Sequence, residues 1–359
     1  KAAGAIVGVY CGPDSTDPRV AEQLRREGIT VESSRAWTAE QAHEAALRLL
    51  DKIQPNIIID DGASFARLAS LERPELTANL IGVEETTSGV RAFQQMQEAG
   101  ALTYPVVAVN DSVLKTGFDN AHGTGETCVT TMQRILGEHA FDGKNVTVIG
   151  YGPVGQGFAR RIRALGAEVT ICDIDPVASL KAVFDGFAAQ DIDEALPCAD
   201  MVVSATGVRH TVTLEHMRAM HEGAALAVIG GIANEIALDE VSDFIPQVNR
   251  DTAQLIVPDG PTLTLIADGD GVNYTVGGGN PIEIMDLSFA VQASAVAYLL
   301  EHRGTLDHTL IRLDAATDQR IAASALKARG YRASHAVEDN GYDWRLTRFA
   351  ENDRENADR

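Results

Sequence analysis

Residues 146–155 read Val-Thr-Val-Ile-Gly-Tyr-Gly-Pro-Val-Gly, a short run of strand-forming side chains that leads into three spaced glycines. A helical pattern follows at residues 158–165. In a strand, turn and helix of this kind, Gly150 permits the tight turn, Gly152 lets the backbone approach a pyrophosphate, and Gly155 allows the helix to pack closely on the strand. The helix N-terminus then faces the phosphate charge. The stretch therefore predicts a dinucleotide site.

An acidic residue completes this pattern at the end of the next expected strand, residues 168–173. Asp173 can accept hydrogen bonds from ribose hydroxyls, and its charge would repel a 2′-phosphate, so the sequence favours NAD over NADP. The alternative is a glycine-rich turn in a sheet that holds no cofactor. The strand before the glycines, the helix after them and the spacing to Asp173 together favour the dinucleotide interpretation.

Apolar runs of strand length alternate with helical patterns along most of the chain, which predicts an α/β fold with parallel sheets covered by helices. At 359 residues the chain is too long for one ordinary core, so we expect two doubly wound, Rossmann-like domains. The expected strands are 6–10, 56–60, 80–83 and 106–110 in the first unit, and 146–149, 168–173, 201–204 and 225–229 in the second.

Two helical segments set the expected domain organisation. A long helix within residues 119–143 links the two units, and an apolar helix over 281–301 returns the chain to the first. We therefore expect a substrate-binding domain from residues 1–121 and 281–330, completed by the C-terminal return helix, and an NAD-binding Rossmann domain from residues 122–280. The last segment, 331–359, is predicted to be a charge-rich C-terminal tail, part of which is mobile or docks on a neighbour.

Composition narrows the class of protein. The formal net charge of −21 repels nucleic acid and anionic membrane surfaces. No apolar stretch is expected to reach the roughly 20 residues of a membrane span, and the chain enters its first strand without a targeting segment. The cysteines are scattered without metal-like spacing, which favours reduced thiols, a cytoplasmic protein and no metal site. They are Cys11, Cys128, Cys172 and Cys198.

Three further segments are more specific than the glycine loop: Asp-Asp-Gly-Ala at 60–63, Gly-Val-Glu-Glu-Thr-Thr-Ser-Gly-Val at 82–90, and Val-Asn-Asp-Ser-Val-Leu-Lys-Thr-Gly-Phe-Asp-Asn at 109–120. In order and spacing they resemble the signature segments of the S-adenosyl-L-homocysteine hydrolase family. The resemblance runs from about residue 4 to residue 300 and weakens afterwards.

The resemblance implies a set of substrate contacts. Glu85, Lys115 and Asp119 match positions that contact the 2′- and 3′-hydroxyls of a bound adenine nucleoside, with Asn120 beside them, and Asp61 matches a position near the 5′ carbon. Without the family, each charged residue alone would be interpreted as a solvated charge at a strand end. Their joint occurrence after apolar strands favours a site.

The resemblance also implies a set of NAD contacts, which includes the glycine loop already described. The implied residues are Thr86, Thr87, Ser88, Gly150, Gly152, Pro153, Val154, Gly155, Asp173, Thr206, Gly207, Ile229, Gly230 and Asn273.

The chemistry that the family implies is redox-assisted elimination. Transient oxidation of C3′ by a tightly held NAD makes a ketone, the ketone acidifies the C4′ proton, and loss of that proton expels the group on C5′. Lys115 is the implied acceptor of the 3′-hydroxyl proton. Glu85 and Asp119 would hold the diol in a reactive position.

The chain also departs from the family pattern. By the same alignment Gly12, Gly231 and Asn280 stand where the family has active-site histidines, and residues 123–126, Gly-Thr-Gly-Glu, replace a cysteine-containing turn. The family's C-terminal Lys/Tyr tail is not recognisable after residue 339. His122 is the histidine close to the matched segments and could replace a lost acid, although a lone histidine at a helix start is more often a capping or surface residue.

These departures suggest that the redox scaffold is kept and the leaving group altered. The leading hypothesis is net dehydration of an adenine nucleoside to an exocyclic alkene, as for a hexulose nucleoside of the angustmycin type in antibiotic biosynthesis. The alternatives are reversible hydrolysis of S-adenosyl-L-homocysteine, a non-catalytic NAD-binding regulator, and a simple dehydrogenase with exchangeable NAD. We expect a homodimer or homotetramer.

Overall fold

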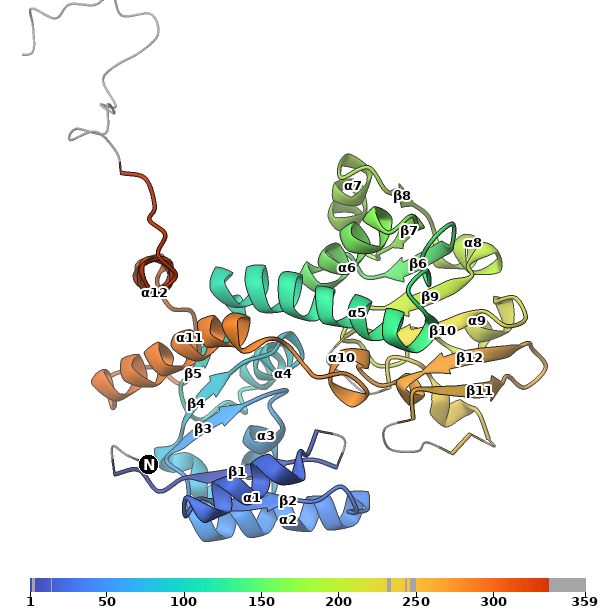
Figure 1. Ribbon diagram of the computed structural model, residues 1–359. Helices are drawn as coiled ribbons and strands as arrows, with labels where there is room; N and C mark the ends of the chain where they lie inside the picture. The colour runs from blue at the N-terminus through green and yellow to red at the C-terminus, as the bar shows by residue number, and fades with distance from the viewer. Residues whose placement is uncertain (2–3, 14, 231–233, 243, 246–249, 336–359) are drawn as a thin grey trace, which may run out of the picture.

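The computed structural model describes residues 1, 4–13, 15–230, 234–242, 244–245 and 250–335. Its chain forms an α/β structure with two main sheets, each covered by helices (Figure 1). The larger sheet holds the glycine loop, and the smaller one holds the other three signature segments. The predicted fold class is confirmed.

The larger sheet has seven strands in the order β11-β12-β10-β9-β6-β7-β8, all paired in parallel except β11 with β12. The chain visits β6, β7 and β8 on one side and then returns to place β9 and β10 on the other. The strand order therefore reverses between β6 and β9, where parallel α/β sheets place their ligands. The strands are β6 (Asn145–Ile149), β7 (Glu168–Cys172), β8 (Ala188–Ala189), β9 (Met201–Ser204), β10 (Ala225–Val228), β11 (Thr252–Ile256) and β12 (Thr262–Ile266).

Helices cover both faces of this sheet. On one face α5 (Gly125–Leu136), α6 (Pro153–Ala164) and α7 (Pro176–Phe184) bury apolar side chains against the central strands. On the other face α8 (Ile192–Ala195) and α9 (Leu214–Ala219) do the same. Burial on both faces explains why the strands are apolar runs without alternation.

The smaller sheet is parallel, with the order β13-β5-β4-β3. Its strands are β3 (Ile57–Asp60), β4 (Ile81–Glu84), β5 (Val106–Ala108) and β13 (Leu310–Ile311). One face packs on α3 (Ser64–Glu72) and α4 (Thr87–Glu98), and the other packs on α11 (Ile282–Glu301) with α12 (Ala315–Ala328). The return helix is therefore present where the sequence predicts it, and β13 lies beyond the point where the sequence pattern weakens.

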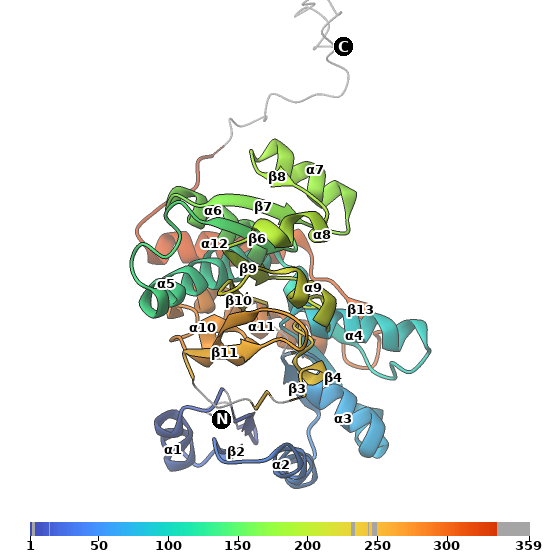
Figure 2. The ribbon, with the colours of Figure 1, turned by 90° about the vertical axis from the view of Figure 1, so that its right-hand side faces the viewer.

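The first predicted strand does not join this sheet. β1 (Gly8–Cys11) pairs in parallel with β2 (Thr30–Ser33) as a separate two-stranded sheet, with α1 (Pro18–Arg26) and α2 (Ala39–Ile53) beside it (Figure 2). The side chain of Leu50, on α2, packs into the core of the four-stranded sheet. Helix α2 thus connects the two sheets through side chains, without backbone pairing.

The linking helix begins before the predicted range and ends within it. It is helical from residue 113, adopts a π-helical form over η3 (Lys115–Thr124), and continues as α5 to Leu136. Gly137 ends the helix with a φ of 102°, a backbone conformation that suits glycine. The predicted boundary between residues 121 and 122 falls inside this continuous helix. π-Helical segments are rare in proteins, and those that occur often lie at functional sites.

The remaining short helices connect the larger elements. They are α10 (Val272–Thr275) and the 3-10 turns η1 (Pro74–Asn79), η2 (Val109–Asp111), η4 (Leu196–Cys198), η5 (Leu238–Glu240) and η6 (Ala267–Gly269).

Helix α11 contradicts the expectation that no apolar stretch reaches the length of a membrane span. Within the described ranges it is long and apolar enough, with 20 residues and a mean hydropathy of 1.3, to meet the length and composition of a membrane span. Such a helix is weak evidence of a membrane protein, because core helices meet the same test. Here Val291, Ala295 and Leu299 are fully buried against β4 and β5, so packing against the sheet accounts for the apolar residues on this face of the helix.

Candidate active site

The glycine loop has the backbone geometry that its sequence predicts. Gly150 has a φ of 97°, which a side chain would strain. A Cβ atom on Gly155 would lie 2.0 Å from the Gly150 carbonyl oxygen, so α6 can approach β6 only without one. A Cβ atom on Gly152 would meet no atom within 4 Å. Gly152 thus borders open space at the start of α6, where Pro153 occupies the first turn.

Asp173 lies directly beside this loop. It follows β7, and one of its carboxylate oxygens accepts the backbone N–H of Tyr151 at 2.6 Å. The other accepts the N–H of Asp175 at 2.9 Å. The acid and the glycine loop, 22 residues apart, are therefore brought together at the carboxyl ends of neighbouring strands.

Glu235 lies beside the ends of β9 and β10, near the place where the strand order reverses. The sequence pattern did not identify this residue. Glu235 is fully buried, and one carboxylate oxygen accepts the Ser204 hydroxyl at 2.5 Å and the Thr206 N–H at 3.0 Å. Burial raises the pKa of this carboxyl group. A Cβ atom on Gly230 would lie 1.9 Å from its other oxygen. Glu235 therefore ties the loop after β9, with Thr206 and Gly207, to the end of β10, with Ile229 and Gly230.

The substrate-side cluster is built on the π-helix η3. The Lys115 ammonium donates to Asn120 Oδ1 at 2.7 Å and lies 3.1 Å from Asp119 Oδ2. All three side chains are buried, with Lys115 only 4% exposed. A lone buried charge is costly, and this one is held by a carboxylate and an amide oxygen.

Glu85 approaches the cluster from the carboxyl end of β4. Its Oε2 atom accepts the Gln292 amide at 2.7 Å, and its Oε1 atom is buried with no partner among the described residues. Burial raises the pKa of Glu85, and the positive charge of Lys115 opposes that shift. Gln292 lies on α11, 207 residues away in the chain, and no local motif marks it as a partner of Glu85.

The buried carboxylate of Glu84 supports the loops on either side of Glu85. Glu84 accepts the N–H groups of Gly62, Ala63 and Thr86 at 2.8–2.9 Å. Burial and, next, the charge of Asp60 raise the pKa of Glu84 to about 8. The carboxylate thus joins the turn after β3 to the start of α4, which carries the three residues Thr86, Thr87 and Ser88 of the implied cofactor set.

Asp61 lies on this turn and faces the cluster. Its side chain is solvent-accessible, yet desolvation by surrounding protein raises its pKa, while the nearby Lys115 charge lowers it and Asp119 raises it. The Asp61 carboxylate is therefore within range of the Lys115 and Asp119 charges. Its accessibility leaves the carboxylate able to contact a ligand there.

Asn280 stands at the centre of the site, where the resemblance places a histidine. Its amide donates to the Asp119 carboxylate and, at 3.1 Å, to the Thr124 hydroxyl. Its carbonyl oxygen accepts the Asn273 amide at 3.1 Å and the Thr127 hydroxyl at 3.0 Å. Asn280 thus links the substrate-side cluster to Asn273 on α10.

Two other positions are not joined to this cluster. His122 is exposed, and its Nδ1 atom lies 3.3 Å from the Arg161 guanidinium. Gly12 lies in the turn after β1, where its carbonyl accepts the Thr16 hydroxyl at 2.7 Å. The third histidine position, Gly231, lies outside the described residues.

Comparison with known proteins identifies the family. Residues 120–279 match the model of the S-adenosyl-L-homocysteine hydrolase NAD binding domain. The chain is 37% identical over 342 residues to an adenosylhomocysteinase of Thermotoga maritima, covering 94% of this chain and 84% of that protein. It belongs to the adenosylhomocysteinase family.

Two other similarities accompany that match. An S-inosyl-L-homocysteine hydrolase of Methanopyrus kandleri is 37% identical over 335 residues, covering 92% of this chain and 78% of that protein. A crystal structure of a glyoxylate reductase from Paecilomyes thermophila is similar with a TM-score of 0.43 and 16% identity, covering 85% of this chain and 98% of that one. The family assignment does not depend on the similarity to the glyoxylate reductase structure.

NAD is the cofactor of this adenosylhomocysteinase-family chain, and the described residues fit it. Gly152 borders open space at a helix N-terminus, which suits a pyrophosphate. Asn273 Oδ1 is buried without a hydrogen-bond partner in the described part of the chain. An unpaired buried acceptor costs about 1–3 kcal/mol, which a donor such as a carboxamide N–H would offset.

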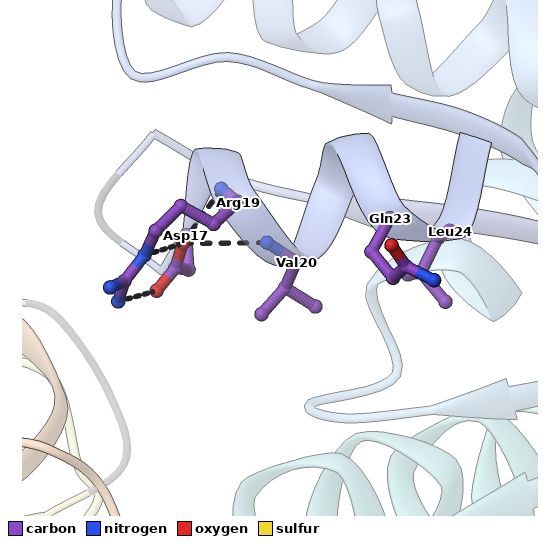
Figure 3. Close-up of a pocket in the computed structure, with 5 residues that line it drawn as sticks. All are labelled: Asp17, Arg19, Val20, Gln23 and Leu24. Carbon is purple, nitrogen blue, oxygen red and sulfur yellow. Dashed lines mark hydrogen bonds and ion pairs between the residues drawn. The ribbon is translucent and has the colours of Figure 1, made fainter. Parts of the chain in front are cut away.

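A surface hollow elsewhere on the molecule has no part in this site. It runs along α1 and is lined by Asp17, Arg19, Val20, Gln23 and Leu24 (Figure 3). Its two charged side chains pair with each other, with 2.9 Å between Arg19 Nη2 and Asp17 Oδ2. None of these residues belongs to the substrate or cofactor set of the adenosylhomocysteinase resemblance.

Proposed function

We propose that the enzyme reversibly hydrolyses the 5′-thioether of a purine nucleoside, with S-adenosyl-L-homocysteine as the substrate and adenosine and homocysteine as products. The buried group of Lys115, Asp119 and Asn120, with Glu85 and Asp61 beside it, carries this proposal. A binding module has no need for a buried lysine held among carboxylates. The named activities of the relatives from Thermotoga maritima and Methanopyrus kandleri support the same reaction class.

We assign the two parts of the chain separate roles. Residues 1–121 and 281–330 bind the nucleoside, residues 122–280 bind NAD, and residues 331–359 form a C-terminal tail. The location of Asp61, Glu85, Lys115 and Asp119 around the smaller sheet and η3 supports this division. We further propose that the enzyme is cytoplasmic and works as a homodimer or homotetramer.

NAD supplies a reversible two-electron oxidation of the carbinol at C3′ of the substrate. Its pyrophosphate would lie on Gly152, Pro153 and Val154, its adenosine ribose on Asp173, and its nicotinamide end near Asn273. Thr206, Gly207, Ile229 and Gly230 would line the other side of the cofactor, and Thr86, Thr87 and Ser88, at the start of α4, would contact it as well. These assignments follow the family resemblance, and the geometry around Gly152, Asp173 and Asn273 supports them.

The chain's own groups orient the diol and move its proton. Glu85 Oε1 is a buried acceptor without a partner in the described residues, so a sugar hydroxyl can donate to it. Asp119 holds the neighbouring hydroxyl, and the Lys115 nitrogen, in its neutral amine form, takes the proton of the 3′-hydroxyl and becomes the ammonium. Asn120 and Asp119 fix the position of that nitrogen. Such positioning contributes to rate because the reacting atoms are already in contact.

Proton removal from C4′ then expels the C5′ substituent, and addition of water to the resulting double bond completes hydrolysis. Asp61 lies near this end of the sugar in the proposed arrangement. Desolvation raises the pKa of its carboxyl group, so Asp61 holds a proton at a higher pH than an ordinary aspartate does.

Net dehydration of a hexulose adenine nucleoside is a second candidate, and Asn280 favours it. An amide has no proton to exchange at neutral pH, and Asn280 fills the centre of the site with four hydrogen bonds to protein groups. An enzyme without an imidazole at this position could complete elimination and fail to add water. The product would then be the exocyclic alkene.

The test compares two substrates on purified, NAD-containing protein. Thiol release from S-adenosyl-L-homocysteine, with adenosine as product, supports hydrolysis. Loss of water from a 5′-hydroxylated adenine nucleoside such as psicofuranine, without thiol release in the first assay, supports dehydration. The Lys115→Met variant is the matched control, since it should abolish both. Folded, NAD-containing enzyme that converts neither substrate would contradict both candidates.

A further inference from the structure

Gln292 connects helix α11 to Glu85. Its side-chain amide donates to Glu85 Oε2 at 2.7 Å, although the two residues are 207 positions apart in the chain. The helix around Gln292 is firmly placed, because Val291 and Ala295 are fully buried against the smaller sheet, beside which α11 runs (Figure 1). The amide therefore approaches Glu85 from a fixed position on a rigid element.

Glu85 is held at its backbone and at one of its two carboxylate oxygens. Its N–H donates to the Asp60 carbonyl at 3.1 Å, just beyond the paired residues of β3 and β4. Gln292 holds Oε2, and Oε1 is buried with no partner among the described residues. A buried acceptor without a hydrogen bond is costly. A ligand hydroxyl that donates to Oε1 would remove this cost.

We propose that Gln292 is a positioning residue for nucleoside binding, which holds Oε2 of Glu85 so that Oε1 is left to accept a hydroxyl group of the sugar. This role rests on the proposed function, because that function makes Glu85 a ligand of the sugar. Gln292 then helps the enzyme to select nucleosides that carry this hydroxyl.

An uncharged donor suits this role. The Gln292 amide orients the carboxylate without neutralising it, and a charged acceptor forms a stronger hydrogen bond with a hydroxyl than a neutral one does. Burial raises the pKa of Glu85, and the Lys115 charge and the Gln292 hydrogen bond oppose that shift. The same bond that orients Glu85 therefore also favours its charged form.

Gln292→Leu tests the proposal, because it removes the amide and keeps a side chain that suits a helix. Calorimetry on the NAD-containing enzyme compares the affinities for adenosine, 2′-deoxyadenosine and 3′-deoxyadenosine. Adenosine should bind about 10-fold less tightly to the variant, as for the loss of a hydrogen bond to a charged group. The deoxynucleoside that lacks the hydroxyl bound by Glu85 should bind within about twofold of its wild-type affinity. Gln94→Leu, at an exposed glutamine on α4, is the matched control and should change none of the three affinities.

An exchange of the two side chains tests the direction of the hydrogen bond. In Glu85→Gln, the new amide must turn its carbonyl oxygen to the Gln292 donor, so it presents an NH₂ group to the sugar where an acceptor is needed. In Glu85→Gln/Gln292→Glu, the new amide donates to the new carboxylate and turns its carbonyl oxygen to the sugar. The double variant should therefore bind adenosine about 10-fold more tightly than Glu85→Gln, although both carry the same side chain at residue 85.

The measurements separate the possible failures. If Gln292→Leu binds adenosine as tightly as the wild type, or weakens all three nucleosides equally, Gln292 does not act through the sugar hydroxyl and the inference is wrong. A double variant that binds adenosine no better than Glu85→Gln also contradicts it. A wild-type enzyme that binds both deoxynucleosides as tightly as adenosine contradicts the sugar contacts of the proposed function itself, and this role falls with them.

Discussion

The side-chain amide of Asn280 donates a hydrogen bond to the carboxylate of Asp119, across 161 residues of sequence. Asp119 is also the ion-pair partner of Lys115, and the carbonyl oxygen of Asn280 accepts the amide of Asn273. One uncharged side chain thus fixes both the substrate-side ion pair and the amide assigned to the nicotinamide end of NAD. A change at Asn280 should therefore affect substrate turnover and cofactor retention together.

Asn280→Ala should release both partners. Loss of hydrogen bonds to buried groups costs about 1–3 kcal/mol, which corresponds to a fall of roughly 5- to 150-fold in an equilibrium constant. We expect turnover to fall and the NAD content after gel filtration to fall with it. Thr130→Ala, at an exposed threonine on α5, is the control and should leave both unchanged. A variant that loses turnover and keeps all of its NAD would show that Asn280 does not orient Asn273.

Lys115→Met should abolish turnover and also destabilise the fold. Removal of the ammonium leaves Asp119 as a buried, unpaired charge, and breaking such a pair costs about 3–5 kcal/mol. Urea unfolding of the NAD-containing protein measures this loss. The double variant Lys115→Met/Asp119→Asn removes the stranded charge and keeps an acceptor for Asn280, so it should regain part of the stability and none of the activity. Equal stability of the single and double variants would contradict the buried ion pair.

Two alanine substitutions in the glycine loop should have different effects. A Cβ atom at residue 155 would collide with the Gly150 carbonyl, so Gly155→Ala should lower the melting temperature with or without NAD. Residue 152 borders open space, so Gly152→Ala should keep the melting temperature of the cofactor-free protein and lose NAD binding. Calorimetry with and without NAD measures both effects. Normal NAD binding by Gly152→Ala would place the pyrophosphate elsewhere.

Glu84 should make the fold less stable as the pH rises. Its pKa is about 8 in the folded chain against 4.5 for the ordinary group, so between these values the folded state holds a proton that the unfolded state has lost. Stability should therefore decrease with pH over this window, by at most about 1.4 kcal/mol per pH unit from this group. Melting temperatures from pH 5 to 8 should fall less steeply in Glu84→Gln. If the melting temperature of Glu84→Gln falls with pH as steeply as that of the wild type, groups other than Glu84 cause the pH dependence.

The sequence predicts the central part of the fold well, because local chemistry determines it. The strand, glycine turn and helix around Gly150 occur where expected, and Pro281 begins the return helix as predicted. The separate pairing of β1 with β2 is a matter of tertiary arrangement that hydrophobic patterns do not record. At the edge of the sheet, β11 alternates exposed and buried residues and β12 alternates partly buried and buried ones, which a search for continuous apolar runs overlooks.

The sequence predicts residues of the candidate site only where they lie within segments that resemble the family's signature segments. Lys115, Asp119 and Asn120 lie within one signature, although their π-helical geometry does not follow from a 3.6-residue period. Gln292 and Glu235 act on residues 207 and 31 positions away, and no local pattern joins them to their partners. His122 was a candidate because it is near Asp119 in the sequence; its side chain contacts Arg161 at the surface, and its catalytic role stays an untested prediction.

The most direct test of the account is deuterium incorporation at C4′ of adenosine when NAD-containing enzyme is incubated with adenosine in D₂O. Hydrolysis and dehydration both require transient oxidation at C3′ and loss of the C4′ proton, so the measurement does not depend on the leaving group. We predict exchange of one hydrogen per nucleoside, with no net accumulation of NADH, and none in Lys115→Met. Folded wild-type enzyme with bound NAD that leaves C4′ unlabelled in adenosine, S-adenosyl-L-homocysteine and psicofuranine would contradict redox-assisted elimination as its function.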